Sequence, residues 1–119
     1  MTMADVDVSE VQALARDINR DAALRQRRLE AAVAAGIDVV YTRAIADAQQ
    51  MRDTGDMIAA TRKIGRGFSR IVRCYDPAGL MNEFGTSSMP PRPWLLVHAD
   101  AGADAVEQGL LRDLNDFLR

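Results

Sequence analysis

The chain has 119 residues, with 15 Lys and Arg against 17 Asp and Glu and a formal net charge of −2 at pH 7. Hydrophobic residues make up 48% and charged residues 27%, which is the composition of a globular domain and not of a disordered chain. This length suits a single domain, 1–119. No apolar stretch approaches the roughly 18 residues that a membrane span needs, and the acidic start does not have the order of a secretory signal.

The first half of the chain has the pattern of a long helix, which we place at 9–52, and we expect 1–8 to be flexible. Ser9 begins a capping-box pattern, and apolar residues follow at helical spacing. Asp21 leaves open whether a second helix begins there. Gly55 is a natural stop for the helical pattern.

The middle region, 56–99, is predicted to hold a β-hairpin, a loop and a strand. Two β-capable stretches, 57–64 and 68–75, are separated by Gly-Arg-Gly at 65–67, which is typical of a hairpin. The first stretch contains adjacent alanines and could instead extend a helix. Asp-Pro-Ala-Gly at 76–79 is expected to end the hairpin.

The last third combines a proline-rich loop with a final helix. Three prolines favour extended backbone over 86–93, and apolar residues at helical spacing predict an amphipathic helix over 103–118. The order of helix, hairpin, loop and helix predicts an α+β fold, with a long N-terminal helix packed on a small antiparallel β-sheet and a C-terminal amphipathic helix.

The sequence contains little that could support catalysis. His98 is the single histidine, and nothing nearby in sequence completes a nucleophile–base pair. Cys74, the single cysteine, excludes an intramolecular disulfide, is typical of a reducing compartment, and lies in an apolar segment that favours an inert thiol. One cysteine and one histidine do not make a zinc site of the usual kind. We therefore expect no enzyme, no cofactor and no metal site.

Basic residues concentrate around the predicted hairpin, while acidic residues outnumber basic ones among the last 20 residues. The basic set is Arg52, Arg62, Lys63, Arg66, Arg70 and Arg73. Such a hairpin could contact DNA phosphates, form a solvated face, or meet the acidic helix of another subunit. Opposite-signed patches on one chain suit head-to-tail, ring-forming contacts.

The loop before the single tryptophan is the most individual feature of the chain. Prolines on both sides of Arg92 hold this arginine on a stiff backbone and lead directly into Trp94. One interpretation is a rigid loop that anchors Trp94 in the core. The other makes Arg92, together with Trp94, a binding anchor, because both residue types are enriched at interface hot spots.

This loop carries a resemblance to a known family. The stretch Glu83-Phe84-Gly85-Thr86, then two residues, then Met89-Pro90-Pro91-Arg92-Pro93-Trp94-Leu95 resembles the signature E-F-G-T…M-P-A-R-P-F-L. That signature belongs to the small tail-completion or neck (head–tail joining) proteins of long-tailed DNA phages, prophages and gene transfer agents. Upstream, 54–61 resembles the family's T-G-x-L-x-x-S-I, although Met57, Ala60 and Thr61 replace the usual Leu, Ser and Ile.

The resemblance implies a structural virion component that joins the DNA-filled head to the tail as one ring in a stack. Its implied partners are copies of itself, neighbouring head-closure and tail-terminator or tail-tube proteins, and DNA that passes through the channel without sequence recognition, with no membrane. It would occur in the bacterial cytoplasm during assembly and then in the neck of the particle. The motif residues implied at interfaces are Glu83, Phe84, Gly85, Thr86, Pro91, Arg92, Pro93 and Trp94.

Two hypotheses about side chains accompany this resemblance. In the first hypothesis, Glu83 pairs with Arg92, and this pair fixes the exit angle of the proline-rich loop. The second places a basic set at the channel lumen or against a neighbouring subunit: Arg62, Lys63, Arg66 and Arg70. The alternative, from another class of protein, is a small DNA-binding protein such as a terminase small subunit or regulator, which would need a helix-turn-helix in the N-terminal half.

Overall fold

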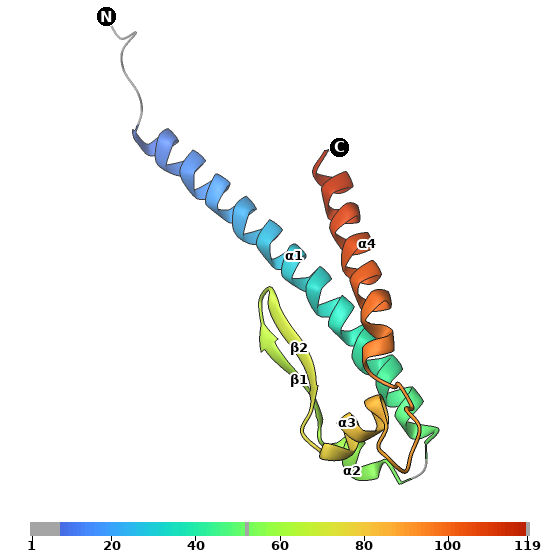
Figure 1. Cartoon of the computed structure of the whole chain (residues 1–119). Coiled ribbons are helices and arrows are strands. Elements are labelled where there is room, and N and C mark those ends of the chain that lie inside the picture. Colours follow the sequence, from blue (N-terminus) through green and yellow to red (C-terminus); the bar gives the residue numbers. More distant parts are fainter. Residues whose placement is uncertain (1–7, 52, 119) are drawn as a thin grey trace, which may run out of the picture.

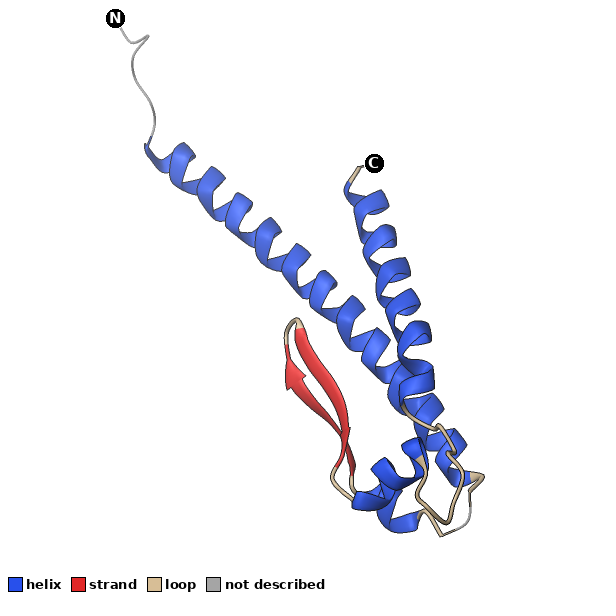
Figure 2. Cartoon of the chain, in the orientation of Figure 1, coloured by secondary structure: helices blue, strands red, loops and turns tan. Residues whose placement is uncertain are grey.

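The computed structural model describes residues 8–51 and 53–118. The elements in chain order are α1 (Val8–Gln49), α2 (Gly55–Ala59), β1 (Thr61–Arg66), β2 (Ser69–Cys74), α3 (Pro77–Phe84), the 3₁₀ turn η1 (Leu96–His98) and α4 (Ala99–Phe117). This is the predicted α+β fold, with a long N-terminal helix, a two-stranded antiparallel sheet and a C-terminal helix (Figures 1 and 2). The flexible segment expected at 1–8 lies outside the described residues except for Val8, which begins α1.

Helix α1 is continuous over 42 residues, about 63 Å at the usual helical rise. Asp21 does not begin a second helix, and Ser9 lies within the first turn instead of preceding the helix as its cap. Residues 8–24 are all exposed, because this part of α1 extends past the end of α4 (Figure 1). The long helix makes the molecule elongated, with extents of 88 × 25 × 20 Å.

Helix α4 runs antiparallel to the second half of α1, and glycines allow the two helices to approach closely. A Cβ atom on Gly36 would lie 2.2 Å from Val106 Cγ2 and 2.7 Å from the Gly102 carbonyl oxygen. A Cβ atom on Gly109 would lie 2.8 Å from that of Ala32. Gly36 interrupts the apolar pattern of the sequence, yet it is buried at this helix crossing.

The hairpin turn begins two residues later than the sequence predicts and ends one residue later. β1 and β2 pair from Thr61 with Cys74 to Arg66 with Ser69, so the turn is the two-residue link 67–68. Gly67 has a φ of 62°, as the first position of a type II′ turn requires. The expected 65–67 link is therefore wrong.

The first predicted strand also begins later than expected, because its opening residues are helical. α2 places Met57 in the core at 1% exposure, and the strand starts only at Thr61. The adjacent alanines, which in the sequence allowed a helix as an alternative, lie at the end of α2, where Ala60 is the C-terminal cap. Burial of one large apolar side chain here outweighs the weak β-propensity of the segment.

The core lies where the end of α1 meets α2, α3 and the segment before η1. Trp94, Met57, Ala44 and Ala48 form its buried cluster. Partly buried side chains pack around it: Met51, Ile58, Cys74, Ala78 and Leu95. A Cβ atom on Gly79 would lie 3.2 Å from Trp94 Cζ2, so this glycine lets α3 pack directly on the indole.

Two further segments differ from the sequence prediction. Asp76 does not merely end the hairpin: its carboxylate accepts a hydrogen bond of 2.8 Å from Ala78 N and caps α3, with Pro77 in the first turn. The strand expected between the loop and residue 99 is absent from the described residues, where η1 leads into α4. In a strand, backbone N–H groups donate to a neighbouring strand. Here the N–H groups of Trp94 and Leu95, at the start of the expected strand, donate to the carboxylate of Glu83 instead.

The α1–α4 crossing yields a stability prediction. Gly36→Val should lower the free energy of unfolding by about 1–3 kcal/mol, because overpacking outweighs the better helix propensity of the new residue. Denaturant unfolding followed by circular dichroism measures this. Gly55→Ala is the matched control, since a Cβ atom there meets nothing within 4 Å. Equal stability of the Gly36 variant and wild type would contradict the close crossing.

Candidate functional site

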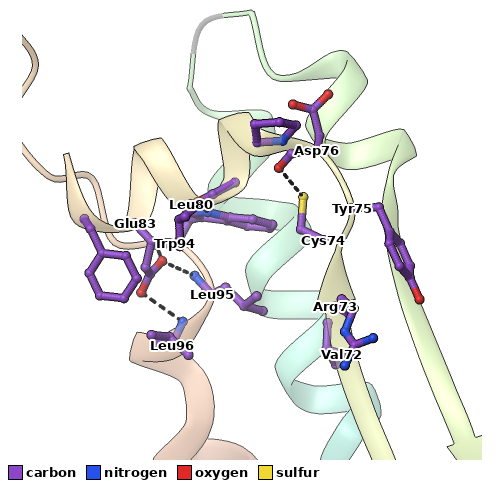
Figure 3. A pocket seen from close by; sticks show the side chains of 13 residues that line it. Val72, Arg73, Cys74, Tyr75, Asp76, Leu80, Glu83, Trp94, Leu95 and Leu96 are labelled. Atoms are coloured by element: carbon purple, nitrogen blue, oxygen red, sulfur yellow. Dashed lines mark hydrogen bonds between the residues drawn. The ribbon is translucent and has the colours of Figure 1, made fainter. Parts of the chain in front are cut away.

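The carboxylate of Glu83 on α3 binds three consecutive backbone N–H groups. Its Oε2 accepts hydrogen bonds from Trp94 N at 2.9 Å and Leu95 N at 3.1 Å, and its Oε1 accepts one from Leu96 N at 3.1 Å. Figure 3 shows the bonds to Leu95 and Leu96. These N–H groups precede and open the helical segment η1–α4, and such groups at a helix start lack partners within the helix and favour an anion. Glu83 therefore caps the start of η1, which leads into α4, from another element.

The chain between Glu83 and Leu96 folds back on α3, and we call residues 83–96 the Glu83 clasp. Gly85, with a φ of 77°, ends α3. Thr86 and Met89 then exchange backbone hydrogen bonds of 2.8 and 3.3 Å, and Arg92 N donates to the Asn82 carbonyl at 2.6 Å. A Cβ atom on Gly85 would lie 2.8 Å from Met89 O, so this close turn requires glycine.

The structure divides the motif residues into two groups. Trp94 is 1% exposed and donates from Nε1 to the Gly79 carbonyl at 3.0 Å, so it is a core residue and not a surface anchor. No ion pair between described side chains joins Glu83 to Arg92, and the pairing hypothesis is wrong, because Glu83 is committed to backbone donors. The exposed group consists of Phe84, Thr86, Pro91, Arg92 and Pro93.

An open apolar pocket of about 610 Å³ lies beside the clasp (Figure 3). β2, α3 and η1 contribute the lining side chains, which include Val72, Tyr75, Leu80, Phe84 and Leu96. Leu80 is 66% exposed and Phe84 is 62% exposed. Large apolar side chains held this far in water are typical of a protein interface.

The polar groups near the pocket have structural partners. Cys74 Sγ lies 3.6 Å from the carbonyl oxygens of both Met57 and Asp76, and His98 Nε2 lies 2.6 Å from Asp47 Oδ2 on α1. Within 8–51 and 53–118, no three His, Cys, Asp or Glu side chains gather as metal ligands would. In the same part of the chain, no helix combines the length and apolarity needed to cross a bilayer.

The four basic residues singled out in the sequence lie on two faces of the hairpin. On the face toward α1, Lys63 Nζ pairs with Asp38 Oδ1 at 3.0 Å and lies 5.1 Å from the Tyr41 ring centroid. Arg70 Nε donates to the Gly67 carbonyl at 2.9 Å. Both cations therefore have partners within the chain.

The outer face of the hairpin carries Arg62 and Arg66 together with Arg73, which belongs to the basic set of the sequence but not to the four residues expected at the lumen. Arg62 lies directly opposite Arg73 in the register. Arg62 donates to the Ala59 carbonyl, and Arg73 lies 5.9 Å from the Tyr75 ring centroid, but none of these three arginines forms an ion pair with a described carboxylate. A correct strand register would have identified these three arginines as neighbours on one side of the sheet. The sequence-based prediction placed the turn at 65–67 and so gave a different register.

Exposed apolar side chains also follow both long helices. Val11, Leu14 and Ile18 are 49%, 60% and 58% exposed. Their spacing continues the stripe by which Ala32 and Gly36 contact α4 farther along α1. On α4 the exposed set is Leu110, Leu111, Leu114 and Phe117. The chain exposes 8816 Å², against about 6,400 Å² for a compact monomer of this size.

Comparisons of this chain with protein-family models, curated proteins and solved structures found no match. The chain's own surfaces and its motif are therefore the basis for inferring its function. The features that stand out are the Glu83 clasp, the exposed apolar stripes and the outer arginines of the hairpin.

The Glu83 clasp yields a second prediction. Glu83→Ala should lower the free energy of unfolding by about 2–4 kcal/mol, because three backbone donors lose a charged acceptor. Arg92→Ala should change it by less than about 0.5 kcal/mol, because Arg92 is exposed. Urea unfolding of both variants measures the two effects. If Arg92→Ala lowered the free energy of unfolding by more than Glu83→Ala does, the assignment of Glu83 to the backbone donors would be contradicted and a Glu83–Arg92 pair favoured.

Proposed function

We propose that this chain is a non-enzymatic structural subunit of the neck of a long-tailed phage, prophage or gene transfer agent. Copies of it form a ring, together with adjacent rings of head-closure and tail-terminator or tail-tube proteins, and the ring joins the DNA-filled head to the tail. The observation that carries the proposal is the amount of apolar surface that one copy leaves in water. A subunit that completes its core only in an assembly has this property.

The apolar stripe of α1 supports this proposal most directly. Between Ala32 and Val40 the stripe contacts α4, whereas Val11, Leu14 and Ile18 belong to the part of α1 that extends beyond α4. An isolated amphipathic helix of about 17 residues is only marginally stable in water without a packing partner. Packing against a neighbouring subunit supplies that partner.

The Glu83 clasp gives the family motif a physical role that suits a rigid ring subunit. Glu83, Gly85 and Trp94 hold the loop through hydrogen bonds and burial. This leaves Phe84 and Arg92 exposed on a braced backbone. A braced loop loses little conformational entropy when it meets an adjacent ring.

The outer arginines of the hairpin favour one second candidate, a small DNA-binding protein. They could bind phosphates without reading sequence. The terminase-like or regulator form of this candidate needs a helix-turn-helix, however, and residues 8–49 form one uninterrupted helix. The neck role accounts for the exposed apolar stripes as well as the charge, so we prefer it.

The neck role predicts a specific assembly defect. In a lysate from a strain that lacks the gene, electron microscopy should show DNA-filled heads lying apart from finished tails. Restoring the gene should restore joined particles. Empty heads would contradict the proposal and favour a role in DNA recognition or packaging.

The exposed stripe of α1 predicts a separation of folding from assembly. The double variant Leu14→Gln and Ile18→Gln should retain the wild-type unfolding free energy within about 0.5 kcal/mol, because both side chains are exposed. The yield of joined particles should fall at least tenfold. Arg16→Gln, on the opposite side of the same helical turns, is the control and should leave the yield unchanged. Normal joining by the double variant would show that the stripe has no partner.

A further inference from the structure

The outer side of the hairpin carries cations around an apolar centre, and we call Arg62, Ile64, Arg66, Ile71 and Arg73 the arginine face. Residues directly opposite one another in an antiparallel pair lie on the same side of the sheet. Arg62 therefore lies beside Arg73, and Ile64 beside Ile71. Two like charges directly opposite one another destabilise a hairpin, so this pair gains from an anionic partner outside the chain.

Helix α4 carries a matching set of anions on the side away from α1. Asp100, Asp104, Glu107 and Leu111 follow one another at intervals of four, three and four residues, so they form one stripe, which we call the acidic face. All four are exposed, and none of the three carboxylates pairs with a described cation. In contrast, Asp113, on the side that faces α1, lies 3.9 Å from Arg28.

The two faces do not pair with each other within the described chain. They are held on different sides of α1: Asp38 and Tyr41 contact the hairpin, whereas Ala32 and Gly36 contact α4. Only the middle of β2, at 70–72, lines a pocket together with the first turns of α4. Figure 1 shows the hairpin and α4 on opposite sides of α1. Two complementary faces on opposite sides of a subunit produce head-to-tail contacts that repeat from copy to copy, and these close into a ring when the rotation allows it.

The two faces also match in length and in chemistry. Arg62 and Arg66 are separated by about 13 Å along the strand, and Asp100 and Glu107 by about 10 Å along the helix. In this alignment the tip of the hairpin reaches the turn of α4 that carries Leu111. Phe68 at that tip is 55% exposed and Leu111 is 51% exposed, so an apolar contact completes the charged one.

We infer that the arginine face of one copy binds the acidic face of α4 on the next copy, and that this contact repeats around the ring. The inference rests on the proposed self-assembly and names the surfaces that make it. Three cations meet three anions, with Ile64 and Ile71 shielded at the centre. Because the contact is largely ionic at its rim, association should weaken as salt concentration rises.

Nucleic acid is the competing occupant of the arginine face, and the structure favours a second copy. Phosphates could neutralise Arg62, Arg66 and Arg73, but they offer no apolar group to the half-exposed Ile71. DNA would also leave the acidic face of α4 unpaired. A second copy supplies partners for both faces at once.

Complementary charge reversal tests this contact on the purified full chain. One variant carries Arg62→Glu, Arg66→Glu and Arg73→Glu, and the other carries Asp100→Lys, Asp104→Lys and Glu107→Lys. By sedimentation velocity over a concentration series, each variant alone should associate at least tenfold more weakly than wild type. An equimolar mixture should recover the wild-type assembly, because every contact in it again joins opposite charges. Recovery also shows that both variants are folded.

The matched control replaces three exposed arginines of α1, Arg16, Arg27 and Arg43, by glutamate. It changes the net charge by the same amount as the arginine-face variant. It should associate as wild type does. A wild-type chain that stays monomeric, an arginine-face variant that assembles normally, or a mixture that fails to recover would each overturn the inference. Loss of DNA retention in the arginine-face variant, with normal self-association of both variants, would assign that face to nucleic acid.

These outcomes separate the contact from the neck role. If deletion lysates contain separate heads and tails but charge reversal has no effect on association, the neck role stands and this contact is wrong. If the mixture recovers assembly but the lysates show empty heads, the contact stands and the neck role falls.

Discussion

The carboxylate of Glu83 is the constraint on which the rest of the structure depends. By binding the N–H groups of Trp94, Leu95 and Leu96, it joins α3 to the start of η1, which leads directly into α4. The same bonds place Trp94 over Gly79 in the core and set the direction in which α4 leaves along α1. A buried or half-buried carboxylate that serves three backbone donors is costly to replace, so the clasp and the helix pair depend on one side chain.

Around this constraint the molecule has a small core and a large apolar surface. Trp94 and Met57 are the main buried side chains at one end, while α1 extends far beyond the region that α4 covers. The close crossing at Gly36 and Gly102 holds the two helices together without filling the space beside them. Such an arrangement leaves the stripes in water, which supports our proposal that the chain is a subunit of an assembly.

The distribution of charges would give the assembly that we propose a direction. Lys63 is neutralised by Asp38 within the chain, whereas Arg62 and Arg73 face outward together. Asp100, Asp104 and Glu107, which pair with no cation among the described residues, lie on the far side of α4. An interface between unlike faces propagates from copy to copy, whereas a self-complementary face would stop at a dimer. The neck role we propose requires the first kind of contact.

The sequence by itself determined a helical first half, the amphipathic last helix, a hairpin between them and the α+β class, because each depends on local periodicity and on glycine and proline positions. That the first half is one unbroken helix past Asp21 was decided by the structure. Tertiary structure alone decided the rest. The turn moved to 67–68 because strand register satisfies the whole ladder, and α2 formed because Met57 is buried. The turn η1 replaced the expected strand because Glu83 accepts hydrogen bonds from the N–H groups of residues 94–96. The strand register also decides which arginines face outward, and local sequence patterns do not determine that register.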